Sequence, residues 1–261
     1  MNTVCHRKRH MKRSRITTVT VPIVAVLGAL VVTNAHAGED CSEATLQGSY
    51  GFQAFGSSPA GEHFAAVGVT TFDGLGGWQS DNTSSVDGVI SRSSSEGKYY
   101  VSSDCTGYMV NPSELLIQNI VIVDGGNEMR SLARMKNAPP NAHWTGLYKK
   151  QNIKDCTAAT MEGNWGYSVQ GWRSVDESFQ PVTLAGRATL DGAGSFDGTE
   201  WRVLGDDFNP VPVFHISYTV SSDCTGETNT RYYFVPVGDG SDAFLIRTAS
   251  GYVTTGSMKK Q

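Results

Sequence analysis

The chain has 261 residues, with 21 basic and 25 acidic side chains and a formal net charge of −4. This acidic balance argues against non-specific binding to nucleic acid or to an anionic membrane surface, because both attract an excess of positive charge. Glycine is abundant, with 29 residues, and the chain after residue 37 has no long stretch of helical periodicity, which favours strands joined by tight turns.

Residues 1–37 have the features of an export signal. Six Lys and Arg residues lie within residues 7–15, an apolar run follows over residues 16–32, and Ala35-His36-Ala37 has the small-residue spacing of a cleavage site. We expect cleavage after Ala37, and Met11 is an alternative start. An uncleaved membrane anchor is the competing interpretation, although the run is near the lower length limit for a spanning helix.

Removal of residues 1–37 would leave 15 of the basic residues and all 25 acidic residues, a net charge of −10. We therefore expect a periplasmic or secreted protein that binds no nucleic acid and, after signal cleavage, no membrane. The sequence leaves its oligomeric state open.

The remaining chain is an internal duplication. Residues 99–107 read YYVSSDCTG and residues 218–226 read YTVSSDCTG, and the motifs before and after this segment also occur twice. Two copies are too few for a solenoid or propeller, whereas about 110 residues are enough for one domain. The duplication predicts one repeat over residues 38–151 and another over residues 152–261.

Four cysteines lie after residue 37, and each repeat has one at its start and one in the DCTG turn. A duplicated crosslink must join the same two positions in each copy, which predicts the disulfides Cys41–Cys105 and Cys156–Cys224. Each would stabilise the fold by about 4 kcal/mol in the chain-entropy treatment. A zinc site is the alternative, but the chain lacks CxxC pairs and paired-histidine spacing.

Within each repeat the apolar residues alternate with a period of two, which indicates strands. Residues 64–72 alternate in this way. Residues 115–123 carry apolar side chains at both the odd- and the even-numbered positions, which predicts a strand buried on both faces. Asp-Gly pairs between these runs suit hairpin turns. We predict an all-β fold of two tandem antiparallel barrels with seven or eight strands each, with β-sandwiches as the alternative, and one short helical turn at residues 42–47.

Four motifs together carry a resemblance to a known group. The motifs are GSYGF at residues 48–52, TFDGLG at 71–76, the DCTG turn and GLYKKQ at 146–151. The second repeat has the DCTG turn unchanged and the related GNWGY, TLDGAG and GSMKKQ at the other three places. The combination resembles uncharacterised secreted bacterial tandem β-barrel repeats with a DCTG motif, which look like calycins of the lipocalin and allene-oxide-cyclase type. The resemblance covers both repeats and implies a barrel fold and export, and it carries over no catalytic residue.

The residues offer little catalytic chemistry. The histidines after residue 37 are His63, His143 and His215, and none recurs at the equivalent position of the other repeat. We therefore expect surface or packing roles for all three. Because histidine exchanges protons near neutral pH, His215, beside a strand start, is the least poor single candidate. No Gly-x-Ser-x-Gly elbow is present. The acidic turns at 191–197 and 238–242 permit a calcium interpretation, but hairpin turns explain the same residues. We predict no catalytic, cofactor-binding or metal-binding residue, and no cofactor.

Aromatic residues give the remaining functional hint. Trp78, Trp144, Trp172 and Trp201 are less clearly paired between the repeats than Tyr50 and Trp165 are. An exposed ring at a barrel rim could bind an apolar ligand or a sugar, although core packing or partial burial is the expected role of each. We expect an exported, non-enzymatic protein that binds a small apolar ligand or a surface partner. The alternatives are a cyclase- or isomerase-like barrel enzyme and a structural or adhesive surface protein. We expect function where the copies differ, as at residues 56–62 and 170–181.

Overall fold

The computed structural model describes residues 40–58, 60, 62–136, 143–176 and 178–261. The expected signal peptide at residues 1–37 lies outside the described residues. Residues 38–261 form one compact unit. Within the described part of the chain, no helix has the length and apolar character needed to cross a membrane.

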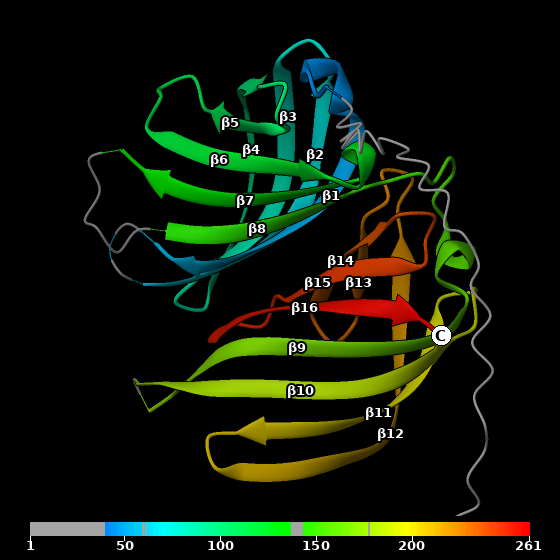
Figure 1. The fold of residues 1–261 in the computed structure, drawn as a ribbon. Helices are drawn as coiled ribbons and strands as arrows, with labels where there is room; N and C mark the ends of the chain where they lie inside the picture. Colours follow the sequence, from blue (N-terminus) through cyan, green and yellow to red (C-terminus); the bar gives the residue numbers. More distant parts are fainter. Residues whose placement is uncertain (1–39, 59, 61, 137–142, 177) are drawn as a thin grey trace, which may run out of the picture. The chain divides into compact units, whose positions relative to one another are not determined.

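This unit contains two closed barrels, each with eight antiparallel strands (Figure 1). Each strand pairs with the next in sequence, and the last pairs with the first. The barrel prediction is thus confirmed, and the sandwich alternative is wrong because closure leaves no free sheet edge. The first barrel contains β1 (Gln47–Ser57), β2 (His63–Asp73), β3 (Gly77–Val86), β4 (Val89–Val101), β5 (Thr106–Val110), β6 (Leu116–Val123), β7 (Glu128–Met135) and β8 (His143–Lys150). The second contains β9 (Gly163–Val175), β10 (Ser178–Leu190), β11 (Ser195–Leu204), β12 (Asp207–Val220), β13 (Gly226–Thr228), β14 (Tyr232–Val237), β15 (Asp242–Arg247) and β16 (Tyr252–Lys260).

The alternation of side chains along each strand fills the barrel interiors. On β6, Gln118, Ile120 and Ile122 point inward and are buried, whereas Val121 and Val123 are 47% and 38% exposed. The prediction that this run is buried on both faces is therefore wrong. A barrel strand has only one interior face, and the outer face of β6 is not covered by another described element.

One end of each barrel is closed by a short 3₁₀ helix, η1 (Glu43–Thr45) in the first and η3 (Ala158–Met161) in the second. The turn expected at residues 42–47 is thus confirmed, with a counterpart in the second repeat. The Tyr99 hydroxyl donates to the Leu46 carbonyl at 2.9 Å, and the Tyr218 hydroxyl donates to the Ala158 carbonyl at 3.1 Å. These bonds fix each helix to its barrel.

Disulfides hold the same helices in place. They join Cys41 to Cys105 and Cys156 to Cys224, the pairs that the duplication predicts, with Cα–Cα distances of 4.9 and 5.1 Å. In both DCTG turns the aspartate accepts from the Thr backbone and hydroxyl two residues later, as at Asp104, where these bonds lower the carboxyl pKa. The repeated motif is a structural staple.

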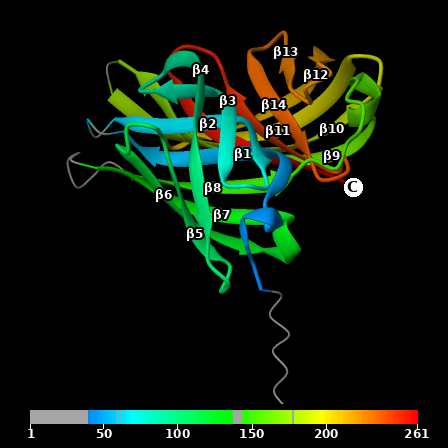
Figure 2. The same cartoon turned by 90° about the horizontal axis from the view of Figure 1, so that it is seen from above.

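The outer faces of the two barrels share a third hydrophobic cluster, formed mainly by residues of β2 and β14–β16. Figure 2 shows the ribbons of the two barrels from above. Its buried members are Ala65, Val67, Tyr233, Val235, Val237, Phe244, Ile246 and Val253. The barrels approach closely at Gly51, where an added Cβ would lie 2.3 Å from a methyl carbon of Val237. Polar contacts border the cluster, including an ion pair of 2.9 Å between Lys149 Nζ and Asp242 Oδ2.

Candidate functional site

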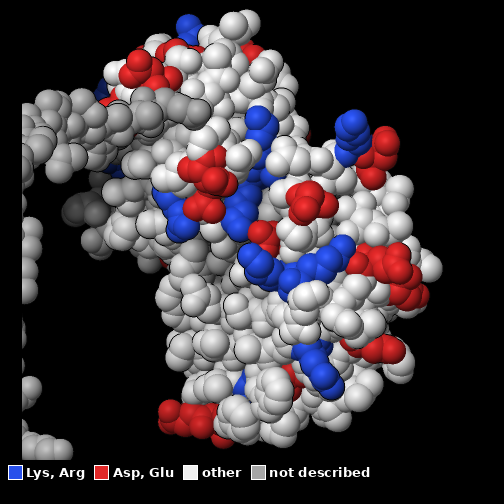
Figure 3. Space-filling view, turned by 45° about the vertical axis from the view of Figure 1, so that its right-hand side comes forward, with Lys and Arg blue, Asp and Glu red and all other residues white. Residues whose placement is uncertain are grey.

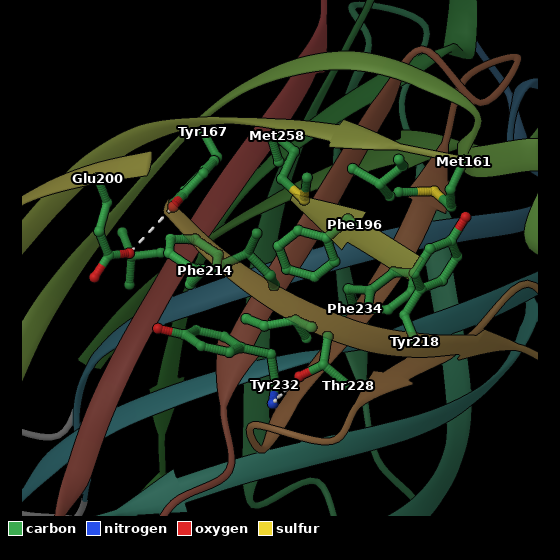
Figure 4. Close-up of a pocket in the computed structure, with 15 residues that line it drawn as sticks. Met161, Tyr167, Phe196, Glu200, Phe214, Tyr218, Thr228, Tyr232, Phe234 and Met258 are labelled. Carbon is green, nitrogen blue, oxygen red and sulfur yellow. Dashed lines mark hydrogen bonds between the residues drawn. The ribbon is translucent and has the colours of Figure 1, made fainter. Parts of the chain in front are cut away.

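The second barrel encloses a cavity of about 70 Å³ within its hydrophobic core (Figure 4). It lies among β9–β16 and is mainly apolar, with a few polar side chains. The lining residues are Met161, Tyr167, Val169, Ala188, Leu190, Phe196, Glu200, Phe214, Ile216, Tyr218, Thr228, Tyr232, Phe234, Leu245 and Met258.

Strand register relates these positions to the first barrel. Phe196, Thr228 and Met258 stand where the first barrel has the larger Trp78, Met109 and Tyr148, all of which are buried. The replacement of larger side chains at these three lining positions helps to leave space in the second barrel.

Hydrogen-bonded side chains fill the equivalent part of the first barrel. The Gln118 side-chain amide donates to Ser131 Oγ at 2.6 Å and to the Tyr148 hydroxyl at 2.8 Å. All three residues are at most 8% exposed. Burial raises the pKa of Tyr148 to about 12, so this phenol stays protonated at neutral pH.

One end of the cavity is closed by Met161, the last residue of η3. Met161 is 1% exposed, and its carbonyl accepts a hydrogen bond from the indole nitrogen of the fully buried Trp165 at 2.8 Å. The Cys156–Cys224 disulfide ties the start of this segment to the DCTG turn. The closed end is therefore a rigid, apolar floor.

The polar side of the cavity is built around a buried carboxylate. Glu200 is 7% exposed, and the Tyr167 hydroxyl donates to its Oε2 at 3.1 Å (Figure 4). The Arg202 guanidinium donates to Oε1 of the same carboxylate. Side chains alternate along β11, so Glu200 and Arg202, two residues apart, both point into the barrel. The first barrel has the neutral Asn82 and Ser84 at these two positions.

The tyrosines beside this carboxylate are held in the neutral form. Burial, followed by the negative charge of Glu200, raises the pKa of Tyr167 far above its usual range. Burial also raises the pKa of Tyr232, and the nearby Arg247 opposes that shift in part. Both phenols therefore remain available as hydrogen-bond donors.

A second arginine lies next to this group. The Arg247 guanidinium is 3.9 Å from the ring centroid of Tyr252 and donates to the Tyr232 hydroxyl at 3.5 Å. Arg173 also lies over the Tyr252 ring, at 5.3 Å. The Nε atoms of Arg202 and Arg247 are buried, and no described atom accepts a hydrogen bond from either. Buried donors of this kind are uncommon in folded proteins.

The three histidines do not line this cavity. His63 Nδ1 lies 3.0 Å from Asp87 Oδ1, and its ring is 4.4 Å from that of Trp172 in the other barrel. His143 is exposed at the start of β8. The side chain of His215 is 81% exposed and contacts Asp197. His215 is therefore a poor site candidate, since solvent surrounds it.

The acidic turns act as backbone caps. Asp191 Oδ1 accepts from the backbone nitrogens of Ala193, Gly194 and Ser195 at 2.8–3.0 Å, and these bonds lower its pKa. The Asp239 carboxylate accepts from Ser241 in the same way. Among the residues that the structure describes, no cluster of three or more His, Cys, Asp or Glu side chains could hold a metal ion.

The four tryptophans singled out in the sequence have different environments. Trp78 is buried in the first barrel, Trp144 is partly buried against its core, and Trp172 stacks on Phe55 of the first barrel with ring centroids 4.8 Å apart. Trp201 is 53% exposed on the outer face of β11, near Phe208, which is 64% exposed. Of the two segments where the copies differ, the described parts of 56–62 and of 170–181 do not line the cavity.

Charge on the outer surface is mixed. On the face in Figure 3, basic and acidic side chains lie close to one another with uncharged surface between them. This face therefore lacks the single-sign field that concentrates polyanions.

No family model matches the sequence, and no curated protein matches it. Solved structures match at low similarity. A protein of unknown function from the DUF3598 family of Nostoc punctiforme has 11% identity and a TM-score of 0.26, over 86% of this chain and 99% of that one. Kievitone hydratase from Nectria haematococca has 7% identity and a TM-score of 0.29, over 86% and 92%. A putative AttH from Nitrosomonas europaea has 9% identity and a TM-score of 0.25, over 82% and 92%. At such scores these likenesses carry no argument about this protein.

Proposed function

We propose that the protein binds a small, mainly apolar ligand inside the second barrel. The cavity behind this proposal has an apolar lining, a closed floor at Met161 and a few polar groups around Glu200. Ligand sites generally combine a concave apolar wall with a small number of polar groups that set orientation. The first barrel, with Gln118 and Tyr148 filling the equivalent region, serves as a scaffold.

The size of the cavity limits the ligand. Its volume of about 70 Å³ is roughly half of the 150 Å³ that admits benzene in an engineered protein cavity. The buried group is therefore compact, on the order of four carbon atoms. Met161 and Met258 lie on the cavity wall, and unbranched methionine side chains can adjust to the shape of such a group.

We also propose that the protein works in the periplasm or outside the cell. The two disulfides support an oxidising compartment, where such bonds persist. The basic and apolar segments within residues 1–37 support export.

The binding proposal can be tested by NMR with methionine methyl groups labelled with ¹³C. Titration with 3-methylbutan-1-ol should shift the Met161 and Met258 methyl resonances in a saturable way. Met109 and Met129, buried in the first barrel, serve as internal controls and should not move. Unchanged spectra for this alcohol and for other compact apolar compounds, or equal shifts at all methionines, would contradict the proposal.

A second candidate function is proton-transfer catalysis in the same cavity, as a cyclase- or isomerase-like barrel enzyme would perform. The supporting observation is the contact between the Tyr167 hydroxyl and the Glu200 carboxylate beside apolar space. Such a pair can donate and accept protons during a reaction. Once a ligand is known, Glu200→Gln should abolish turnover while the Met258 methyl still reports binding; unchanged turnover would exclude this role.

A structural or adhesive role is the third candidate. It is favoured by the exposed apolar residues Trp201, Val203 and Phe208 on the outer faces of β11 and β12. In this case Trp201→Ser with Phe208→Ser should weaken surface adhesion without altering the cavity. Equal adhesion by the variant and the native protein would remove the candidate.

A further inference from the structure

We infer that the ligand of the second barrel is a compact organic anion, whose carboxylate is bound by Arg202 and Arg247 while its apolar part occupies the cavity. This inference rests on the proposed binding function and names the chemical class of the ligand. It follows from the charge, the unpaired donors and the differences between the two repeats.

The charge around the polar side of the cavity is not balanced. Arg202 forms an ion pair with the Glu200 carboxylate. Arg173 and Arg247 have no ion-pair partner among the described residues. Arg173 and Arg247 both lie over the ring of Tyr252, and Arg202 interacts electrostatically with Tyr252 and Tyr232, which places the three cations at one site. Burial of a positive group is costly unless an anion is near it, so this site favours one additional negative charge.

The unpaired donors indicate the shape of that anion. The Nε–H groups of Arg202 and Arg247 are buried and have no acceptor among the described atoms. An arginine Nε–H and an adjacent NH₂ group form a planar fork that matches the two oxygens of a carboxylate. The Tyr232 hydroxyl lies 3.5 Å from an Arg247 nitrogen and lines the cavity. Because Tyr232 stays protonated, its hydroxyl can donate a further hydrogen bond to the anion.

The first barrel lacks this arrangement. The position equivalent to Arg247 holds Ala133 in the first barrel. The positions equivalent to Arg202 and Glu200 hold Ser84 and Asn82. Their side chains place no charge on the barrel interior. The anion site is thus present in the second barrel alone, which is also the barrel that contains the cavity. The anion site and the apolar cavity together favour a ligand with one charged end and one apolar end.

Matched probes separate the two parts of the inference. The compounds 3-methylbutanoate and 3-methylbutan-1-ol have the same branched apolar part and differ in the charged group. Titrations of the ¹³C-methyl-methionine protein, followed at Met161 and Met258, give a dissociation constant for each. We expect the acid to bind about tenfold more tightly than the alcohol, in line with one charge-assisted hydrogen-bonded contact.

The variant Arg247→Met should remove most of this tenfold preference and leave the affinity for the alcohol nearly unchanged. Arg247 is preferred to Arg202 for the test, because loss of Arg202 would strand the buried Glu200 carboxylate. Arg247→Lys keeps the charge but not the fork, and should retain part of the preference. Arg134→Met, at an exposed position of β7, is the matched control and should bind both probes as the native protein does.

The outcomes are distinct. Equal affinities for acid and alcohol in the native protein would overturn the anion inference and leave the proposed binding function intact. A preference for the acid that persists in Arg247→Met would assign the anion to another site and also overturn the inference. If neither probe moves Met161 or Met258, both the inference and the proposed function fail for ligands of this size.

Discussion

Filling the cavity of the second barrel should stabilise the protein. Ala188 lines the cavity from β10 and is 3% exposed, so Ala188→Val adds two carbon atoms to the empty space. A void of about 70 Å³ costs about 1.7 kcal/mol at about 24 cal/mol per Å³. Burial of two methyl-sized groups contributes about 1.6 kcal/mol. The two values agree, and we expect a gain of about 1 to 1.5 kcal/mol.

Guanidinium chloride unfolding measures this gain, provided that the m-value stays the same. The change corresponds to a rise in melting temperature of about 2 to 6 °C for a protein of this size. The matched control is Ala66→Val on β2, where a buried alanine faces the filled interior of the first barrel. There the added methyl groups should cost about 1 to 3 kcal/mol through overpacking. If Ala188→Val is as destabilising as Ala66→Val, the space described in the second barrel does not exist.

Three further predictions concern the disulfide, the buried carboxylate and a buried phenol. Replacement of both Cys156 and Cys224 by Ser should lower the free energy of unfolding by about 4 kcal/mol, which denaturant titration measures. Peptide mapping under non-reducing conditions checks the pairing, and a crosslink from either cysteine to the first repeat would contradict it. Glu200→Gln should lower the free energy of unfolding by about 3 kcal/mol, since the partly buried Arg202 guanidinium loses its ion-pair partner. The same variant should lower the pKa of Tyr167, because the negative charge beside this phenol is removed. An unchanged ultraviolet titration of the tyrosines would refute this second effect. Burial raises the pKa of Tyr148 from 10.0 to about 12, so the folded state holds this proton more tightly and stability is lost as the pH rises from about 10 to 12. Tyr148→Phe should reduce that loss by up to about 1.4 kcal/mol per pH unit in this range, and an unchanged alkaline stability profile would argue against the raised pKa.

The fold was predictable because its determinants are local and occur twice. Alternating residues such as 64–72 specify a strand with one buried face, and Asp73 with Gly74 specifies a tight turn between two strands. The duplication identifies equivalent cysteines without any knowledge of the structure. Burial on the outer face of β6 could not be predicted, because an apolar outer residue such as Val121 has the same sequence pattern whether or not another element covers it.

The candidate site was harder to predict because its parts come from distant strands. Glu200 is on β11, Tyr167 on β9 and Arg247 on β15, and only closure of the barrel brings them together. Among the histidines His215 was the least poor single candidate, and its side chain lies on the outside. A signal was nevertheless present: Glu200 and Arg202 are two residues apart in a strand whose equivalent positions in the first repeat are neutral.

The contact between the barrels joins two different faces of the repeated unit. The first barrel contributes the outer face of β1–β2 and the second contributes that of β14–β16, so the contact is head-to-tail, and repetition of such a contact builds an open filament. The equivalent face of the second barrel is polar, because exposed Thr183 and Arg187 replace Ala65 and Val69. The equivalent face of the first barrel stays partly apolar, since Val121 and Leu132 are exposed there. The polar residues on β10 thus disfavour a further contact of the same kind.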